Sequence, residues 1–180
     1  MISSHIIKLI GLACILLFNT HVHAKQTTNI FYSGYFTVSI PTQSLEGATF
    51  FLADGPGIKF SSDRHLVGSV ITRDEEGFSA EFDLKSYPLY LFGWKETDNL
   101  SPEIADRFVR SRAELIASMN NPTLDSMEVP GATVYSACSE RCVAFVVQDD
   151  QDEQLLMLTS QGFSAIDLAG VLQGPPHAAE

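Results

Sequence analysis

The segment ATVYSACSERCVAFVVQ, residues 132–148, contains two short runs that are rich in β-branched and aromatic residues. The runs 132–137 and 142–148 have strand composition, and the turn Ser139-Glu140-Arg141 lies between Cys138 and Cys142. A three-residue hairpin loop places the two cysteines opposite one another, at a separation that a disulfide spans. We therefore predict an antiparallel hairpin closed by a Cys138–Cys142 disulfide. A redox-active cysteine pair is the alternative.

Further apolar or alternating runs lie on both sides of this hairpin. They predict strands at 30–40, 66–72, 78–84, 89–94 and 155–159, and residues 48–52 form a further apolar run that ends at turn residues. Tight turns separate the three runs between residues 66 and 94, which is typical of an antiparallel meander. The acidic turn 149–153 precedes the last run.

Two segments have helical patterns instead. Ser101 is a good N-cap, Pro102 suits the first helical position, and apolar residues recur at helical spacing, which predicts a helix over 102–119. A second, short helix begins at Ser164, where Asp167 completes a capping box. The pattern predicts an α+β domain whose antiparallel sheet of about six strands packs against a long central helix and a short C-terminal helix.

The N-terminal 24 residues have the pattern of a signal peptide. Lys8 precedes the run 9–18 of apolar or small residues, and small residues occupy the cleavage positions before Lys25. The run is too short to span a bilayer, which takes roughly 20 residues. We expect residues 25–175 to form one exported domain, in the periplasm or secreted, and 176–180 to be a disordered tail. Lipidation at Cys14 and a retained anchor are the alternatives.

Charge limits the classes of partner. The chain has 11 Lys and Arg, 22 Asp and Glu and a net charge of −11, and removal of residues 1–24 makes it −12. This field repels phosphate backbones and anionic lipids, so we expect neither nucleic acid binding nor, after cleavage, a membrane span. A protein partner, in particular a cationic one, is compatible with it.

Few residues suit catalysis or metal binding. After cleavage only His65 and His177 remain, which is too few nitrogen ligands for a structural zinc site, and we expect no cofactor. His65 is the one plausible base for a small hydrolase. The weak candidate for calcium is the acidic turn, with four carboxylates, those of Asp149, Asp150, Asp152 and Glu153.

Aromatic residues suggest a different kind of site. In a strand over 89–94, the alternate residues Tyr90, Phe92 and Trp94 share one sheet face. If exposed, they form a patch for a partner; packing in the core is the alternative.

The run Tyr35-Phe36-Thr37-Val38-Ser39-Ile40-Pro41, followed by the long helix, the meander and the closing helix, resembles the PsbP/Mog1-type α/β/α sandwich. That group includes small exported accessory proteins, and the resemblance implies a binding or assembly role without assigning functional residues. The first hypothesis is therefore an exported, non-catalytic binding or accessory protein. An immunity or inhibitor protein against a basic toxin is a variant of it, and a small hydrolase using His65 is the competing class.

Overall fold

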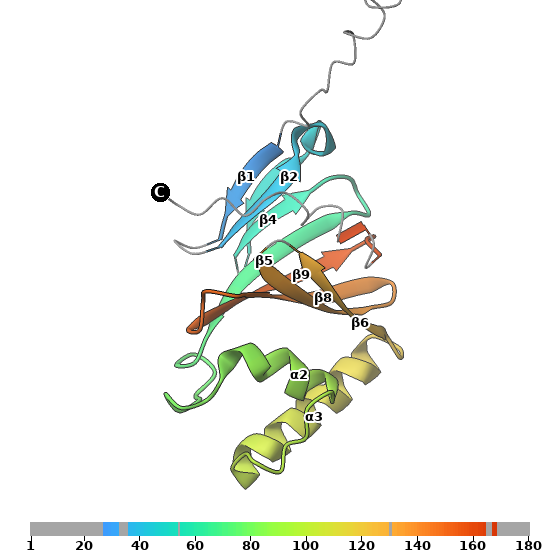
Figure 1. Cartoon of the computed structure of the whole chain (residues 1–180). Helices are drawn as coiled ribbons and strands as arrows, with labels where there is room; N and C mark the ends of the chain where they lie inside the picture. The colour runs from blue at the N-terminus through green and yellow to red at the C-terminus, as the bar shows by residue number, and fades with distance from the viewer. Residues whose placement is uncertain (1–26, 33–35, 54, 130, 165–166, 169–180) are drawn as a thin grey trace, which may run out of the picture.

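A computed structural model describes residues 27–32, 36–53, 55–129, 131–164 and 167–168 of the chain (Figure 1). The expected signal peptide, the C-terminal tail and Asp54 lie outside the described residues. Seven strands form the main sheet: β3 (Thr49–Leu52), β4 (Pro56–Lys59), β5 (His65–Thr72), β6 (Thr123–Val129), β7 (Ala132–Cys138), β8 (Arg141–Gln148) and β9 (Gln154–Gln161).

The strands follow the order β3-β4-β5-β9-β8-β7-β6, and every neighbouring pair is antiparallel. Each half of the sheet is a run of consecutive hairpins, and the β5–β9 pair joins the two halves over eight residue pairs. Two helices of the described chain, α2 (Tyr87–Phe92) and α3 (Pro102–Ser118), are inserted between β5 and β6. The predicted α+β class with an antiparallel sheet is confirmed in these broad terms.

The β7–β8 hairpin forms as predicted. Cys138 lies opposite Cys142 in the register, and an S–S bond of 2.08 Å joins them. Strand β8 is apolar on both of its faces: Ala144 and Val146 are buried on one side of the sheet, and Phe145 and Val147 on the other. A strand buried on both faces reads as a continuous apolar run, which explains the sequence of this segment.

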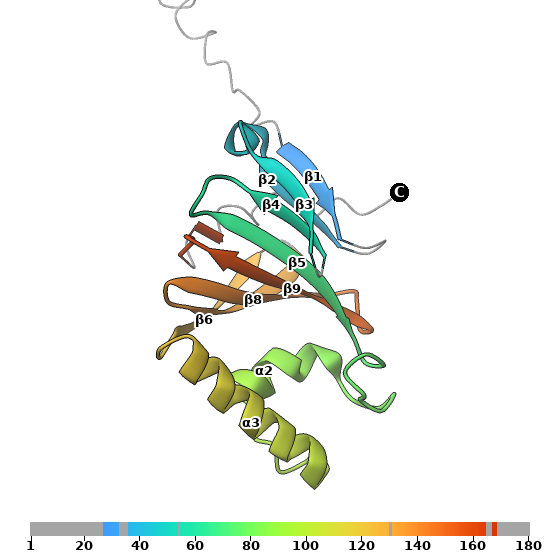
Figure 2. The ribbon, with the colours of Figure 1, turned by 180° about the vertical axis from the view of Figure 1, so that it is seen from behind.

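A two-stranded hairpin covers one face of the sheet (Figures 1 and 2). It consists of β1 (Thr27–Phe31) and β2 (Thr37–Pro41), and Val38 and Ile40 are buried in the same core cluster as Ile58 of β4. The prediction of one strand over 30–40 is wrong. The chain reverses within this run, and the hydrogen bond from Tyr32 N–H to the Phe36 carbonyl, 3.0 Å long, closes the reversal.

The helices α2 (Tyr87–Phe92) and α3 (Pro102–Ser118) cover the opposite face (Figure 1). The predicted strand at 89–94 is therefore wrong. Pro88 lies in the first turn of α2, and Gly93 ends the helix in the left-handed region, with φ of 79°. Proline at the start and glycine just past the end are helix signals, whereas a short apolar run by itself does not distinguish a helix from a strand.

The predicted strand at 78–84 is wrong as well. Phe78 and Phe82 are buried and stack on each other, with ring centroids 4.0 Å apart, and Phe82 also stacks on Phe108 of α3. The segment therefore contributes rings to the core between sheet and helices, and it ends in the 3-10 turn Leu84–Ser86. Because the predicted strands at 78–84 and 89–94 do not form, the meander predicted over 66–94 contains one strand, β5.

The predicted helix over 102–119 is confirmed as α3. The Ser101 hydroxyl accepts a hydrogen bond from the Ile104 N–H, and Phe108 is buried against the sheet. Arg107 does not pair with a carboxylate on its own helix. Instead it donates to the Glu76 carbonyl and lies over the Phe78 ring, 4.1 Å from its centroid. Strand β6, which follows α3 directly, was not predicted.

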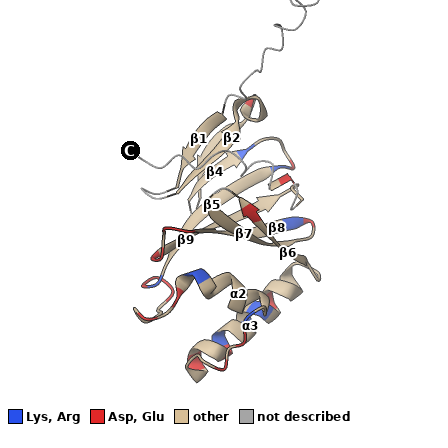
Figure 3. Cartoon of the chain, viewed as in Figure 1, with Lys and Arg blue, Asp and Glu red and all other residues tan. Residues whose placement is uncertain are grey.

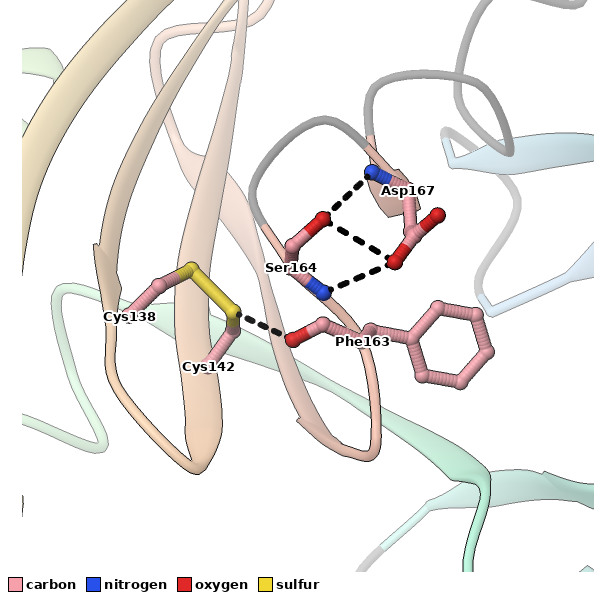
Figure 4. The surroundings of a disulfide bond; sticks show 5 residues. All are labelled: Cys138, Cys142, Phe163, Ser164 and Asp167. Atoms are coloured by element: carbon pink, nitrogen blue, oxygen red, sulfur yellow. Dashed lines mark hydrogen bonds between the residues drawn. A yellow bond between two sulfur atoms is a disulfide. The ribbon is translucent and has the colours of Figure 1, made fainter.

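The capping box at Ser164 is present (Figure 4). The Ser164 N–H donates to the Asp167 carboxylate over 3.1 Å, and the Asp167 N–H donates to the Ser164 hydroxyl over 3.2 Å. These bonds hold the pKa of Asp167 below its ordinary value, the backbone bond being the larger cause. Residues 167 and 168 are helical, and the rest of the predicted short helix lies outside the described residues.

Candidate functional site

The edge strand β3 exposes three large apolar side chains in a row. Phe50 is 56% exposed, Phe51 37% and Leu52 84%, and no charged residue interrupts the strand. Strand β3 is the last strand at one end of the main sheet. An exposed, apolar edge strand is a feature that sheet proteins ordinarily avoid, because it offers pairing to another chain, although the four residues of β3 keep this edge short.

The backbone of β3 also offers hydrogen bonds. Leu52 lies opposite Pro56, which has no N–H, and the Ala53 N–H donates to the Gly55 carbonyl over 3.0 Å. In an antiparallel ladder this arrangement directs the polar backbone groups of Phe51 toward β4 and those of Phe50 and Leu52 away from it. Within the described part of the chain, these outward groups have no hydrogen-bond partner.

The two faces of β3 differ. Phe50 lies opposite Ile58, a buried residue of the core under the β1–β2 hairpin, so Phe50 and Leu52 lie on that face of the sheet. Phe51 lies on the other face, where its ring covers Gly57 so closely that an added Cβ on Gly57 meets two ring atoms at 2.5 Å. Gly57 thus lets the Phe51 ring lie flat on β4.

Charge is distributed unevenly over the molecule (Figure 3). Residues 27–60 contain three charged side chains, those of Glu46, Asp54 and Lys59. Residues 61–168 contain eight Lys or Arg and 19 Asp or Glu. Strand β3 therefore lies in a nearly uncharged part of a strongly acidic protein.

The structure corrects the predicted aromatic patch. Tyr90 and Phe92 are 3% and 4% exposed in the core, on helix α2 and not on a strand, and only Trp94 reaches the surface at 44%. The Trp94 ring makes an edge contact with Tyr135 of β7, at 5.9 Å between centroids. On a helix, alternate residues do not share a face, so the three side chains cannot form one exposed row.

The acidic turn makes protein contacts. The Lys85 ammonium donates to the Asp149 carbonyl over 2.6 Å and lies 2.6 Å from the Asp152 carboxylate. Hydrogen bonding and charge from Lys85 hold the pKa of Asp152 below its ordinary value. Within the described residues, no three His, Cys, Asp or Glu side chains gather as metal ligands, so Asp149, Asp150, Asp152 and Glu153 do not converge.

His65 is the first residue of β5 and lies opposite Lys59 and Gln161. Two surface hollows lie elsewhere. One, of about 390 Å³, lies between the end of α3 and the disulfide hairpin, and the other, of about 370 Å³, lies beside Arg73 and Glu153. Neither includes His65, and the hydrolase hypothesis stays a prediction.

A cluster that sequence reasoning missed lies at the start of α2. The Ser86 hydroxyl donates to the Asp83 carboxylate over 2.5 Å and accepts from the Lys95 ammonium over 2.9 Å. Serine beside lysine is a combination found in hydrolases, but Ser86 is only 4% exposed. The cluster ties both ends of the short helix together, and Arg112 adds bonds to its last carbonyls, those of Tyr90 and Leu91.

The disulfide lies beside the C-terminal segment (Figure 4). The Cys142 sulfur is 3.1 Å from the Phe163 carbonyl oxygen, and because a disulfide sulfur carries no hydrogen this is a close contact and not a donated bond. Cys142 is fully buried. The bridge therefore belongs to the core under the β1–β2 hairpin.

Comparison of the chain with protein-family models, with curated proteins and with solved structures finds no match. Among the described residues, no helix has the length and apolar character that crossing a membrane requires.

Of the candidate sites described above, the β3 edge has the strongest physical argument. Its signal in the sequence is the apolar run 48–52, whose composition indicates neither the strand nor its exposure.

Proposed function

We propose that this chain is an exported, non-catalytic binding or accessory protein, located in the periplasm or secreted, that recognises a protein partner through the β3 edge. The observation that carries the proposal is the exposed, uncharged row Phe50, Phe51 and Leu52, on a strand whose outward backbone groups have no partner among the described residues. The disulfide is compatible with an oxidising compartment. The proposed likeness to PsbP/Mog1-type accessory proteins agrees with such a role.

The physical argument is that both components of recognition by strand addition are present. Main-chain groups of an edge strand supply affinity, and alternate side chains supply specificity. Exposed apolar surface that is contiguous along a strand is costly to keep in water, so it is typical of an interaction site. The low charge around β3 removes the repulsion that the acidic remainder of the chain imposes on most partners.

The test is capture of partners from the native extracytoplasmic fluid by the immobilised protein. Leu52→Lys places a charge on the open edge without removing a buried group, because Leu52 is 84% exposed. We expect it to lower capture at least about 10-fold, as for an interface hot spot. The matched control is Val109→Lys on α3, where the side chain is 56% exposed and lies away from β3. Equal capture by the two variants contradicts the proposal.

The inhibitor of a basic toxin is a second candidate that one observation favours. The excess of 19 acidic over eight basic residues in 61–168 suits a cationic partner. This candidate predicts capture that weakens steeply with salt and is indifferent to Leu52→Lys. Recognition through β3 predicts instead that capture depends little on salt and is lowered by Leu52→Lys.

A further inference from the structure

We propose that the occupant of the β3 edge is β3 of a second copy of this chain, so that two seven-stranded sheets join into one continuous sheet across a twofold axis. This inference rests on the proposed binding role of the edge and names its partner. Three observations carry it: the direction of the backbone groups, the alternation of the side chains, and the distribution of charge.

The backbone groups limit the possible registers. Phe50 and Leu52 direct their N–H and C=O groups away from β4. Among the antiparallel registers that a twofold axis perpendicular to the sheet allows, one uses Phe50 and Leu52 of both copies. It places Phe50 of one copy opposite Leu52 of the other, and Phe51 opposite Phe51. Each Phe50–Leu52 pair exchanges both of its hydrogen bonds. All the outward polar groups of both strands are satisfied at once.

The side chains match in the same register. Phe50 and Leu52 lie on the face of the β1–β2 hairpin, so two Phe50–Leu52 pairs cover that face across the junction. The two Phe51 rings meet on the opposite face, each backed by a Gly57. Cross-strand pairs of aromatic and aliphatic side chains stabilise antiparallel sheets. A shift by one residue places each side chain opposite one on the wrong face, which disfavours other registers.

The distribution of charge favours self-association at the β3 edge. Two copies of an acidic protein repel each other, and the repulsion is smallest where the facing surfaces carry least charge. Within residues 27–60 only Glu46, Asp54 and Lys59 are charged, whereas residues 61–168 hold 19 acids against eight bases. The β3 end is therefore the place where two copies approach with the least electrostatic cost.

The exposed area of the three β3 side chains limits the affinity of the dimer. Since a buried aromatic side chain contributes roughly 150–250 Å², the exposed parts of Phe50, Phe51 and Leu52 amount to roughly 300 Å² on each copy. Stable interfaces bury about 1,200–2,000 Å² in total. We therefore expect a weak dimer with a Kd above about 1 µM, which forms at high local concentration.

The experiment combines sedimentation with cysteine scanning of the full chain in which Cys14 is replaced by serine, so that the native disulfide accounts for both remaining cysteines. Sedimentation equilibrium of this protein from about 1 µM to about 1 mM covers the expected range of Kd. Single variants Phe50→Cys, Phe51→Cys and Leu52→Cys are then oxidised, and cross-linked dimer is measured on non-reducing gels. Ser126→Cys, an exposed position on the opposite edge strand β6, is the matched control.

The register predicts one result. Two Phe51→Cys residues face each other at about 4.5 Å between Cα atoms, within the span of a disulfide. Two Phe50→Cys or two Leu52→Cys residues are offset by two positions, at roughly 8–9 Å, beyond that span. We expect Phe51→Cys to cross-link at least about 10-fold faster than the other variants and the control.

A monomer throughout the concentration range overturns the inference, as does cross-linking at Phe50→Cys or Ser126→Cys that equals Phe51→Cys. In those cases loss of capture by Leu52→Lys still supports the binding role, with a different protein as partner. If Leu52→Lys captures normally while Phe51→Cys cross-links selectively, the dimer stands and the proposed recognition of other partners fails.

Discussion

The two edge strands of the main sheet are built differently. Strand β6 has the exposed carboxylates Asp125 and Glu128 along its length, whereas β3, at the other end, has Phe50, Phe51 and Leu52 and no charge. Charges on an edge strand discourage another chain from adding to it. Within the described part of the chain, one edge of this sheet is therefore protected and the other is open, which agrees with the binding role that we propose for the open edge.

The largest expected effect concerns the support of the open edge. A Cβ added to Gly55 lies 1.9 Å from the Gly68 backbone carbonyl oxygen, so Gly55→Ala must displace the backbone between β4 and β5. We expect it to lower the free energy of unfolding by about 3 kcal/mol. Urea unfolding measures this loss.

The matched control is Gly57→Ala, whose added Cβ meets atoms of the partly exposed Phe51 ring first. The ring can swing outward, so we expect a loss of about 1 kcal/mol. Equal losses in the two variants contradict the assignment of a backbone obstacle at Gly55. A smaller effect of Gly57→Ala in a Phe51→Ala background identifies the ring as its obstacle.

The next effect concerns the half of the sheet that carries the protected edge. The Cys138–Cys142 bridge closes a short loop, so replacing both cysteines by alanine should lower the free energy of unfolding by about 2 kcal/mol. Hydrogen exchange should show faster opening of β6–β8 and unchanged β3–β4. Uniform acceleration over the whole sheet contradicts this local role of the bridge.

Removing the protection from β6 should leave stability almost unchanged but create a second open edge. Asp125 and Glu128 are exposed, so the double variant Asp125→Val, Glu128→Val should change the free energy of unfolding by less than about 0.5 kcal/mol. Self-association, measured by light scattering, should increase. If scattering does not rise, the two carboxylates do not protect this edge.

The smallest effect at neutral pH concerns Tyr32, which covers Gly68 in the half that carries β3. Burial raises the pKa of Tyr32 to about 12 from the ordinary 10.0. Because the folded pKa is the higher one, the stabilisation is fully present below pH 10 and is lost as the pH rises from 10 to about 12. Tyr32→Phe should reduce that alkaline loss, which unfolding as a function of pH measures.

The same variant tests the hydroxyl at neutral pH. The Tyr32 hydroxyl is buried and has no hydrogen-bond partner among the residues that the structure describes, so Tyr32→Phe should be neutral or slightly stabilising there. Tyr87→Phe is the comparison in the helical half, where burial and then Glu76 raise the pKa of Tyr87 to about 12 while Arg107 lowers it. A loss of stability at pH 7 in Tyr32→Phe shows that the hydroxyl has a partner.

The elements that could be predicted are those with local signals. The β7–β8 hairpin has two strand-forming runs around a three-residue turn, and α3 has the cap Ser101 and an apolar stripe. The strand prediction for the α2 segment failed because Tyr87–Phe92 is apolar on all sides and has no helical periodicity. In the structure this helix packs against Phe108 and Phe145. Strand β6 was missed because Asp125 and Ser126 interrupt its alternation, which an edge strand tolerates.

The candidate site could not be predicted in the same way. The segment Thr49–Leu52 is recognisable in the sequence as an apolar run, but nothing in it indicates that it forms an edge strand whose free side is uncovered. Conversely, Tyr90 and Phe92 had the composition of a surface patch and are buried. Exposure depends on residues far away in the chain, such as the insertion of both helices between β5 and β6.

The amino-acid sequence alone specified the hairpin, its disulfide, the long helix and the acidic charge, because each depends on residues within a few positions of one another or on simple counting. The tertiary structure decided which strands are central, which side chains are buried and which edge is open. Those properties depend on the order β3-β4-β5-β9-β8-β7-β6, in which β5 and β9, more than 80 residues apart in the chain, become neighbours.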